Sequence, residues 1–146
     1  MPAFLRTTLG RLTLAQAVLP GPGGSFSPVE QAWHLADLER EGYAARIRRL
    51  LEEERPQLAD FDGAGIARER NYRSLSVLEG IAAFESARRE NLARLRLVRG
   101  DAWNREGTQE GVGAVSLCDL PAMMAEHDRG HQEEIREWLE AVRPFA

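Results

Sequence analysis

The sequence predicts an all-α fold, a four-helix bundle formed by one domain over residues 1–146. Apolar residues recur at helical spacing in four long segments, and no segment has the alternating pattern of a convincing strand. Proline and glycine residues interrupt the chain between these segments. A chain of this length can bury most of its apolar surface in one core, and four long helices fit a bundle.

The first predicted helix covers residues 3–19 and ends at the PGPGG stretch of residues 20–24. Its leucines recur at helical spacing: Leu5, Leu9, Leu12 and Leu19. This segment also follows the initiating methionine, where a signal peptide would lie. Polar residues interrupt its apolar run, so an amphipathic helix explains it better.

The second predicted helix begins at a capping box. Ser27 is the expected N-cap, Pro28 the first helical residue, and Glu30 the reciprocal partner of Ser27. The helix continues to about residue 55, where Pro56 stops it. Its first half is apolar on more than one side, which predicts two neighbouring helices.

The second half of the chain supplies two more helices. Residues 57–73 read as a loop with one short helical turn, and the third long helix covers residues 74–98. A glycine-containing connector follows at residues 99–115. The last helix runs from residue 116 or 119 to residue 142, and Pro121 favours the later start. The longer connectors permit a crossover in place of a strict up-down path.

Composition excludes several classes of protein. The formal net charge of −4 argues against a nucleic-acid binder. No apolar run approaches the ~18 residues of a membrane span. The single cysteine, Cys118, excludes an internal disulfide framework and a multi-cysteine zinc cluster. We therefore expect a cytoplasmic protein.

Two histidines stand four positions apart on the last helix, in the stretch AEHDRGHQEEI of residues 125–135. They fall within one inward stripe at helical spacing: Leu120, Met124, His127, His131, Ile135, Trp138 and Val142. Two adjacent imidazoles in an apolar core need partners for all their ring nitrogens. A divalent ion bound by both rings would meet that need, whereas two structural core histidines are the alternative.

A zincin protease is excluded on two grounds. In H-D-R-G-H the shorter aspartate takes the place of the zincin glutamate that reaches the metal-bound water. A zincin also needs a third ligand, but no histidine follows His131, and the possible carboxylates Glu137 and Glu140 lie on the same helix.

Three segments together resemble the DinB-like proteins, and the resemblance covers nearly the whole chain. The segment FSPVEQAWHLADLE, residues 26–39, is similar to an early-helix motif of that family. WNREGTQEGVG, residues 103–113, is similar to its glycine-bearing loop. HDRGHQEEI, residues 127–135, is similar to its histidine motif and the helical tail that follows it. The resemblance implies a crossed four-helix bundle with a divalent ion, nickel or zinc, on His34, His127 and His131. Helical spacing does not place His34 on the apolar stripe.

Two further residues are candidates for the site. Asp37 lies three positions after His34, where it would orient a ligand ring, or it is a solvated or capping acid. Arg88 falls within the inward stripe of the third helix, where it would hold a substrate anion or form a salt bridge.

The leading functional hypothesis is a metal-dependent enzyme that acts on a small molecule. A three-histidine ion leaves positions open for water or substrate. The resemblance implies an S-transferase that uses a metal-activated low-molecular-weight thiol, or a hydrolase, and it also implies a homodimer. The alternative is a non-catalytic stress-response binding protein with a structural or vestigial metal site. Elemental and spectroscopic analysis of the purified protein separates them.

Overall fold

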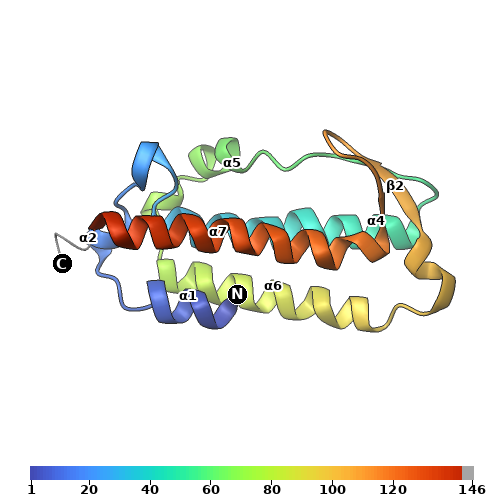
Figure 1. Cartoon of the computed structure of the whole chain (residues 1–146), viewed down its shortest axis with the longest axis horizontal. Coiled ribbons are helices and arrows are strands. Elements are labelled where there is room, and N and C mark those ends of the chain that lie inside the picture. The colour runs from blue at the N-terminus through green and yellow to red at the C-terminus, as the bar shows by residue number, and fades with distance from the viewer. Residues whose placement is uncertain (143–146) are drawn as a thin grey trace.

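The computed structural model describes residues 1–142, and within them four helical rods pack along one axis (Figure 1). The rods are α1 (Pro2–Leu9), the continuous run of α3 (Pro28–Asp37), η2 (Leu38–Tyr43) and α4 (Ala44–Glu52), then α6 (Val77–Arg96) and α7 (Leu120–Val142). The shorter helices are α2 (Leu14–Ala17), η1 (Pro22–Gly24), α5 (Gly63–Glu69), η3 (Tyr72–Ser74), η4 (Gly100–Asn104) and η5 (Leu117–Asp119). The predicted all-α four-helix bundle is confirmed. Among the described helices, none combines the length and apolarity needed to cross a membrane.

The chain crosses back over the bundle between α4 and α6 (Figure 1). The run from α3 to α4 points the same way as α6, whereas α1 and α7 point the opposite way. The connector therefore returns along the bundle, and it carries α5, the short helix expected within residues 57–73. This path is the crossover that the connector lengths permit.

The prediction of one helix over residues 3–19 is wrong. The chain forms α1 and α2 instead, because Thr13 begins a second helix with its own capping box. The backbone N–H of Thr13 donates to Gln16 Oε1 at 2.9 Å, and the N–H of Gln16 donates to Thr13 Oγ1 at 3.2 Å. Leu5 and Leu9 are fully buried, but Leu19 is 43% exposed because the break removes it from their face.

The second predicted helix begins as expected and contains a widened turn. Ser27 N–H donates to Glu30 Oε2 at 2.8 Å, and the predicted capping box of Ser27 and Glu30 is confirmed. The segment η2 is π-helical and changes the angular register between α3 and α4. π-Helical segments are rare in proteins, and those that occur are often found at functional sites. Here the segment carries Glu39 and Tyr43, both buried.

Three short strands correct the prediction of a chain without strands. They are β1 (Gln57–Leu58), β2 (Glu106–Gln109) and β3 (Gly113–Ser116). β2 pairs antiparallel with β3 and parallel with β1. Gly111 and Gly113 have positive φ, 76° and 101°, in the turn between β2 and β3, where glycine avoids a steric penalty. The strands are too short for a period-two pattern to stand out.

Two apolar clusters divide the core along the bundle. On α7, Met124 belongs to one cluster and Ile135 to the other. His127 and His131 lie between those two positions. The last helix begins at Leu120 with Pro121 in its first turn, as predicted. The polar layer between the clusters is therefore built from predicted helical positions.

Candidate metal centre

The inward stripe predicted for the last helix is confirmed on α7. Leu120, Met124, Ile135 and Trp138 are buried, and they flank the two histidines on both sides. His127 and His131 are partly buried, so their rings keep some access to solvent. Because they are one helical turn apart, their rings lie side by side.

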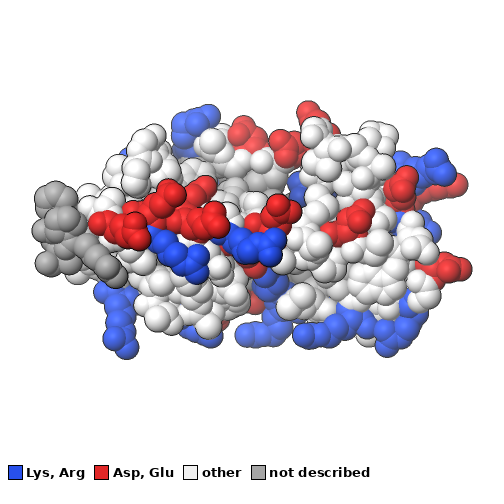
Figure 2. Space-filling model, in the orientation of Figure 1, with Lys and Arg blue, Asp and Glu red and all other residues white. Residues whose placement is uncertain are grey.

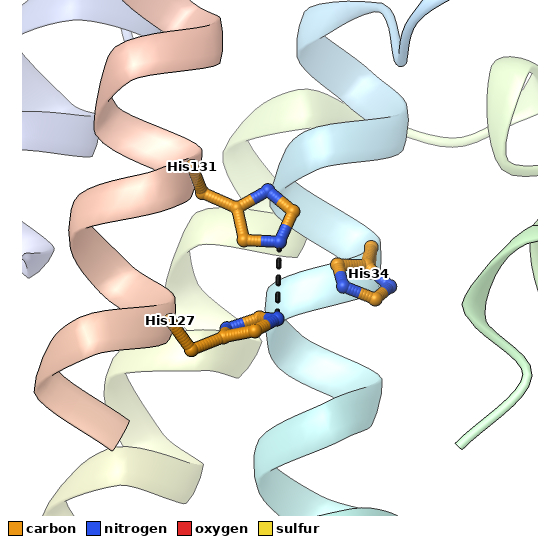
Figure 3. A group of neighbouring side chains, drawn as sticks. All are labelled: His34, His127 and His131. Atoms are coloured by element: carbon orange, nitrogen blue, oxygen red, sulfur yellow. Dashed lines mark hydrogen bonds between the residues drawn. The ribbon is translucent and has the colours of Figure 1, made fainter. Parts of the chain in front are cut away.

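The structure brings the three histidines of the chain together (Figure 3). His34 comes from α3 and faces His127 and His131 from α7. One ring nitrogen from each residue lies within 4.8 Å of those of the other two. The two Nε2 atoms of His127 and His131 are 3.1 Å apart. The His34 ring centroid is 5.6 Å from that of His127 and 4.9 Å from that of His131.

His34 is buried, with 8% of its surface exposed, although helical spacing places it off the apolar stripe. The reason is that α3 is covered on several sides. Gln31 and Asp37, which share the His34 side of the helix, are as buried as Val29 and Ala36. A helix buried all round has no single inward face from which a ligand can be predicted.

The Nδ1 edge of the His34 ring lies against Gly63, the first residue of α5. A Cβ atom at Gly63 would lie 2.6 Å from His34 Nδ1 and 3.7 Å from Nε2. Figure 3 shows one nitrogen of His34 directed towards the other histidines and one directed away. Nε2 is therefore the nitrogen of His34 that faces the centre. Nδ1 is buried without a hydrogen-bond partner among the described residues.

A chain of hydrogen bonds fixes the ring of His131. Gln31 Nε2 donates to Glu134 Oε2 at 2.6 Å, so the amide oxygen of Gln31 is turned towards His131. That oxygen, Oε1, lies 2.6 Å from His131 Nδ1. The Nδ1 atom must then carry the hydrogen, because an amide oxygen only accepts. In the neutral form of this ring, Nε2 keeps its lone pair and lies 3.1 Å from Nε2 of His127.

Burial keeps His34 and His127 neutral. Desolvation by burial, followed by the nearby rings of His131 and His127, lowers the pKa of His34 to about 3. Desolvation also lowers the pKa of His127 to about 4, with a contribution from His131. Neutral imidazoles offer lone pairs to a metal ion, whereas imidazolium ions do not.

These residues fit a divalent transition-metal ion. Three imidazoles from two helices converge, and the second nitrogen of His131 already has the carbonyl partner that ligating histidines usually have. Nitrogen ligands of this kind suit zinc, nickel, copper or iron better than magnesium or calcium. Three protein ligands leave a coordination position open.

Aromatic side chains surround the three rings. Phe26 and Phe61 pack against His34, with ring centroids 5.3 and 6.0 Å away. Tyr43 meets the His127 ring edge-on at 6.4 Å. These aromatic side chains limit the water that reaches His34 and His127.

Asp37 does not orient a histidine in this structure. Its carboxylate is buried and accepts hydrogen bonds from Arg40 at 2.8 Å, from Arg70 at 2.7 Å and from the hydroxyl of Tyr72 at 2.5 Å. Its charge reaches His34 only through space. The residue holds α3 against the segment of α5 and η3, which is a structural position.

Arg88 forms the salt bridges that were the alternative to anion binding. Its guanidinium donates to both carboxylate oxygens of Asp128, at 2.8 and 2.9 Å, and to Glu39 at 2.8 Å. The amide of Asn91 completes the cluster by donating to Glu39 at 2.8 Å. With two carboxylates around it, Arg88 is already neutralised by the protein.

Sequence reasoning missed Gln31, Glu134 and Gly63. Gln31 precedes His34 by three residues, and Glu134 follows His131 by three residues. Positions three apart share a helix face, so polar residues at that spacing from each histidine were the available signal. Nothing in the sequence near Gly63 indicates the approach of a ring from α3.

Comparisons with known proteins agree with this architecture. A family model described as DinB superfamily matches residues 2–135. A search of curated proteins finds no match. Among solved structures, the chain is similar to YfiT from Bacillus subtilis, which is described as a probable metal-dependent hydrolase with an unusual four-helix bundle topology. The TM-score is 0.87 at 20% sequence identity, over 97% of this chain and 81% of that chain. This similarity shows that the two proteins share a fold.

Proposed function

This chain belongs to the DinB superfamily, and from that membership we propose that it is a metal-dependent enzyme acting on a small molecule. His34, His127 and His131 are the proposed ligands of a divalent ion, nickel or zinc. The observation that carries the proposal is the convergence of one nitrogen from each ring within 4.8 Å. The membership supports it, because the ligand motifs stand in the matched part of the chain.

Different residues of the chain have different roles at this proposed metal centre. An ion on three histidines acts as a Lewis acid and lowers the pKa of a water or thiol that it binds. Gln31 holds the ring of His131 in the tautomer that leaves Nε2 free. Phe26 and Phe61 exclude water beside His34, and the partial exposure of His127 and His131 leaves a path for a small substrate.

Two reactions are compatible with such a centre. Hydrolysis is supported by the description of YfiT, whose fold this chain shares. Transfer of a low-molecular-weight thiol is supported by the nitrogen-only ligand set, since zinc and nickel also bind thiolate well. The proposal covers both reactions, and the second experiment below separates them.

The ligand assignment is tested by elemental analysis of the purified protein and of His34→Ala, His127→Ala and His131→Ala. We expect about one ion per chain in the parent protein and loss of that ion in each variant. Gln132→Leu, one residue from His131 and outside the centre, is the control and should keep its ion. Unchanged metal content in His34→Ala would contradict a three-histidine centre.

The nucleophile is tested by titrating small thiols into the cobalt or nickel form of the protein. A thiolate charge-transfer band is expected if the enzyme is an S-transferase. Absence of a band with every biological thiol, together with turnover of ester or amide substrates, would assign hydrolysis. A fully coordinated ion that accepts neither thiol nor other exogenous ligands would instead favour the non-catalytic binding protein.

A further inference from the structure

Arg46 of α4 is a buried cation without a salt bridge. Only 7% of its surface is exposed, and no carboxylate within residues 1–142 lies within 4.0 Å of its guanidinium. Its Nε atom has no hydrogen-bond partner in the same part of the chain. Its Nη2 atom reaches only the carbonyl of Ala59, at 3.5 Å, the outer limit of a hydrogen bond.

This situation is unfavourable without a counter-ion. A buried charge is normally paired, because desolvation of an unpaired ion is expensive. Burial lowers the pKa of Arg46, yet a guanidinium remains protonated at neutral pH. The comparison with Arg88 is direct, since Arg88 is similarly enclosed and has two carboxylates around it.

Arg46 lines a cavity of about 120 Å³ between α4 and the β1–α5 connector. Gly42 and Leu58 form its buried wall, and Phe61 closes it on one side. Glycine is required at position 42, because a Cβ atom there would lie 2.6 Å from Leu38 Cδ1 and 3.6 Å from the Phe61 ring. The cavity holds a group the size of a carboxylate.

The other charged groups that line the cavity are mostly committed elsewhere. Glu41 pairs with Arg70 at 2.6 Å, and Arg49 pairs with Glu53 at 2.5 Å. Asp60 is exposed and lies beyond salt-bridge distance from Arg46. It is therefore the one acid lining this cavity, in the described structure, that competes with an incoming anion for Arg46.

Two aromatic rings lie between this cavity and the histidines: Phe61 on the side of His34, and Tyr43 on the side of His127. Phe61 lines the cavity and packs against His34 at 6.0 Å. The guanidinium of Arg46 lies over the ring of Tyr43 at 5.3 Å, and Tyr43 in turn contacts His127 at 6.4 Å. Phe61 and Tyr43 therefore lie between Arg46 and the histidines, and a substrate held at Arg46 reaches the metal centre past one of these two rings.

We propose that Arg46 binds an anionic oxygen group of the substrate, a carboxylate or a phosphate, in the cavity beside Phe61. The planar guanidinium donates paired hydrogen bonds to two oxygens of such a group. This inference rests on the proposed function for the identity of the occupant as substrate. It assigns to Arg46 the role that the sequence suggested for Arg88.

The experiment measures anion binding to the chelator-treated protein, so that no ion at the histidines competes. Acetate and inorganic phosphate are titrated at constant ionic strength, with chloride as the reference, and the thermal unfolding midpoint is followed. The two anions distinguish a carboxylate site from a phosphate site. The variants are Arg46→Met, Arg46→Lys and Asp60→Asn. Arg48→Met is the matched control, because Arg48 is an exposed arginine of the same helix.

We expect acetate or phosphate to raise the midpoint of the parent protein and of Arg48→Met. The affinity should fall about tenfold or more in Arg46→Met, where a charged hydrogen-bond donor is lost. It should rise in Asp60→Asn, because the competing carboxylate is gone. If Arg46→Met fails to fold, Arg46→Lys, which keeps the charge without the planar fork, and Asp60→Asn carry the test.

Equal anion binding in Arg46→Met and the parent protein, or no binding by the parent protein, would overturn the assignment. Metal content measured on the same variants keeps the two proposals separate. Arg46→Met should keep its ion, whereas His34→Ala should lose its ion and still bind the anion. One combined result would overturn this inference and leave the proposed function standing. In that result the histidine variants lose their metal, and Arg46→Met binds the anion as tightly as the parent protein does.

Discussion

Gln31 Oε1 lies 2.6 Å from His131 Nδ1, although the two residues are 100 positions apart in the sequence. The contact joins α3 to α7 at the candidate metal centre. Glu134 holds the other end of the amide, so the oxygen cannot exchange places with the nitrogen without losing a hydrogen bond. Gln31 therefore determines which nitrogen of His131 is free to bind an ion.

Replacing Gln31 should weaken metal binding without removing a ligand. In Gln31→Leu the His131 ring loses its acceptor, and we expect the affinity for zinc or nickel to fall by about 10- to 100-fold. Competition with a chromophoric chelator measures this change. Nitrogen NMR shifts of the metal-free protein should show His131 as the Nδ1–H tautomer in the parent and as a mixture in the variant. Unaltered affinity in Gln31→Leu would show that the contact does not position the ligand.

The metal-free protein should lose stability as the pH falls from about 6.5 to 4.5. The pKa of His34 is lowered to about 3 and that of His127 to about 4, so the unfolded chain binds protons that the folded state excludes. The free energy of unfolding should therefore decrease with a slope approaching 1.4 kcal/mol per pH unit for each such histidine, an order-of-magnitude value. Urea unfolding at several pH values measures it.

The variant His34→Gln provides the control for this pH dependence. In this variant, the free energy of unfolding should depend less steeply on pH between 6.5 and 4.5, because the contribution of one buried histidine is absent. Glu134 has its pKa lowered to about 2, by its contact with His131 first, and its stabilising charge is lost only below about pH 4.5. A slope that His34→Gln leaves unchanged in the upper window would contradict the burial of a neutral His34.

The sequence predicts the bundle well where one face of a helix decides its packing. The stripe on α7 has one inward face, so spacing alone places His127 and His131 correctly. The capping box at Ser27 is equally local and is confirmed. The break at Thr13 was also readable, because T-L-A-Q is a second capping box, but the leucine spacing that continues through it masks the signal.

Spacing fails where contacts come from distant parts of the chain. His34 is enclosed by α7 and by the start of α5, so only the family resemblance nominated it. The same reason explains Arg88 and Arg46. The inward stripe of the third helix drew attention to Arg88, whereas nothing in the sequence distinguished Arg46. Only the tertiary structure shows that Arg88 meets two carboxylates and that Arg46 meets none among the described residues.

Removing Arg88 should destabilise the protein strongly. Arg88→Met leaves the carboxylates of Glu39 and Asp128 enclosed without a counter-ion, and breaking a buried pair typically costs about 3–5 kcal/mol. Arg89→Met, the exposed neighbour on α6, should change the free energy of unfolding by less than about 0.5 kcal/mol. Urea denaturation of the two variants measures the difference. A loss below about 1 kcal/mol in Arg88→Met would show that the cluster is not a structural support of α6 and α7.

Two glycine substitutions should have opposite effects, because one glycine touches a ligand ring and the other touches nothing. A Cβ atom at Gly63 would lie 2.5 Å from His34 Cε1, so Gly63→Ala has to displace the ring or α5. Overpacking of this kind costs about 1–3 kcal/mol. The displaced ring should also bind metal more weakly. At Gly130, on α7 between His127 and His131, a Cβ atom would have no neighbour within 4 Å.

Gly130→Ala should therefore stabilise the protein by up to about 1 kcal/mol, the helix preference of alanine over glycine, and should leave metal affinity unchanged. Thermal unfolding and chelator competition on both variants make the comparison. The pair separates the ring contact from general sensitivity of the centre to added methyl groups. If Gly63→Ala kept full metal affinity, α5 would not confine His34. Loss of metal in Gly130→Ala would contradict the expectation that a methyl group at this open position leaves the ligands on α7 undisturbed.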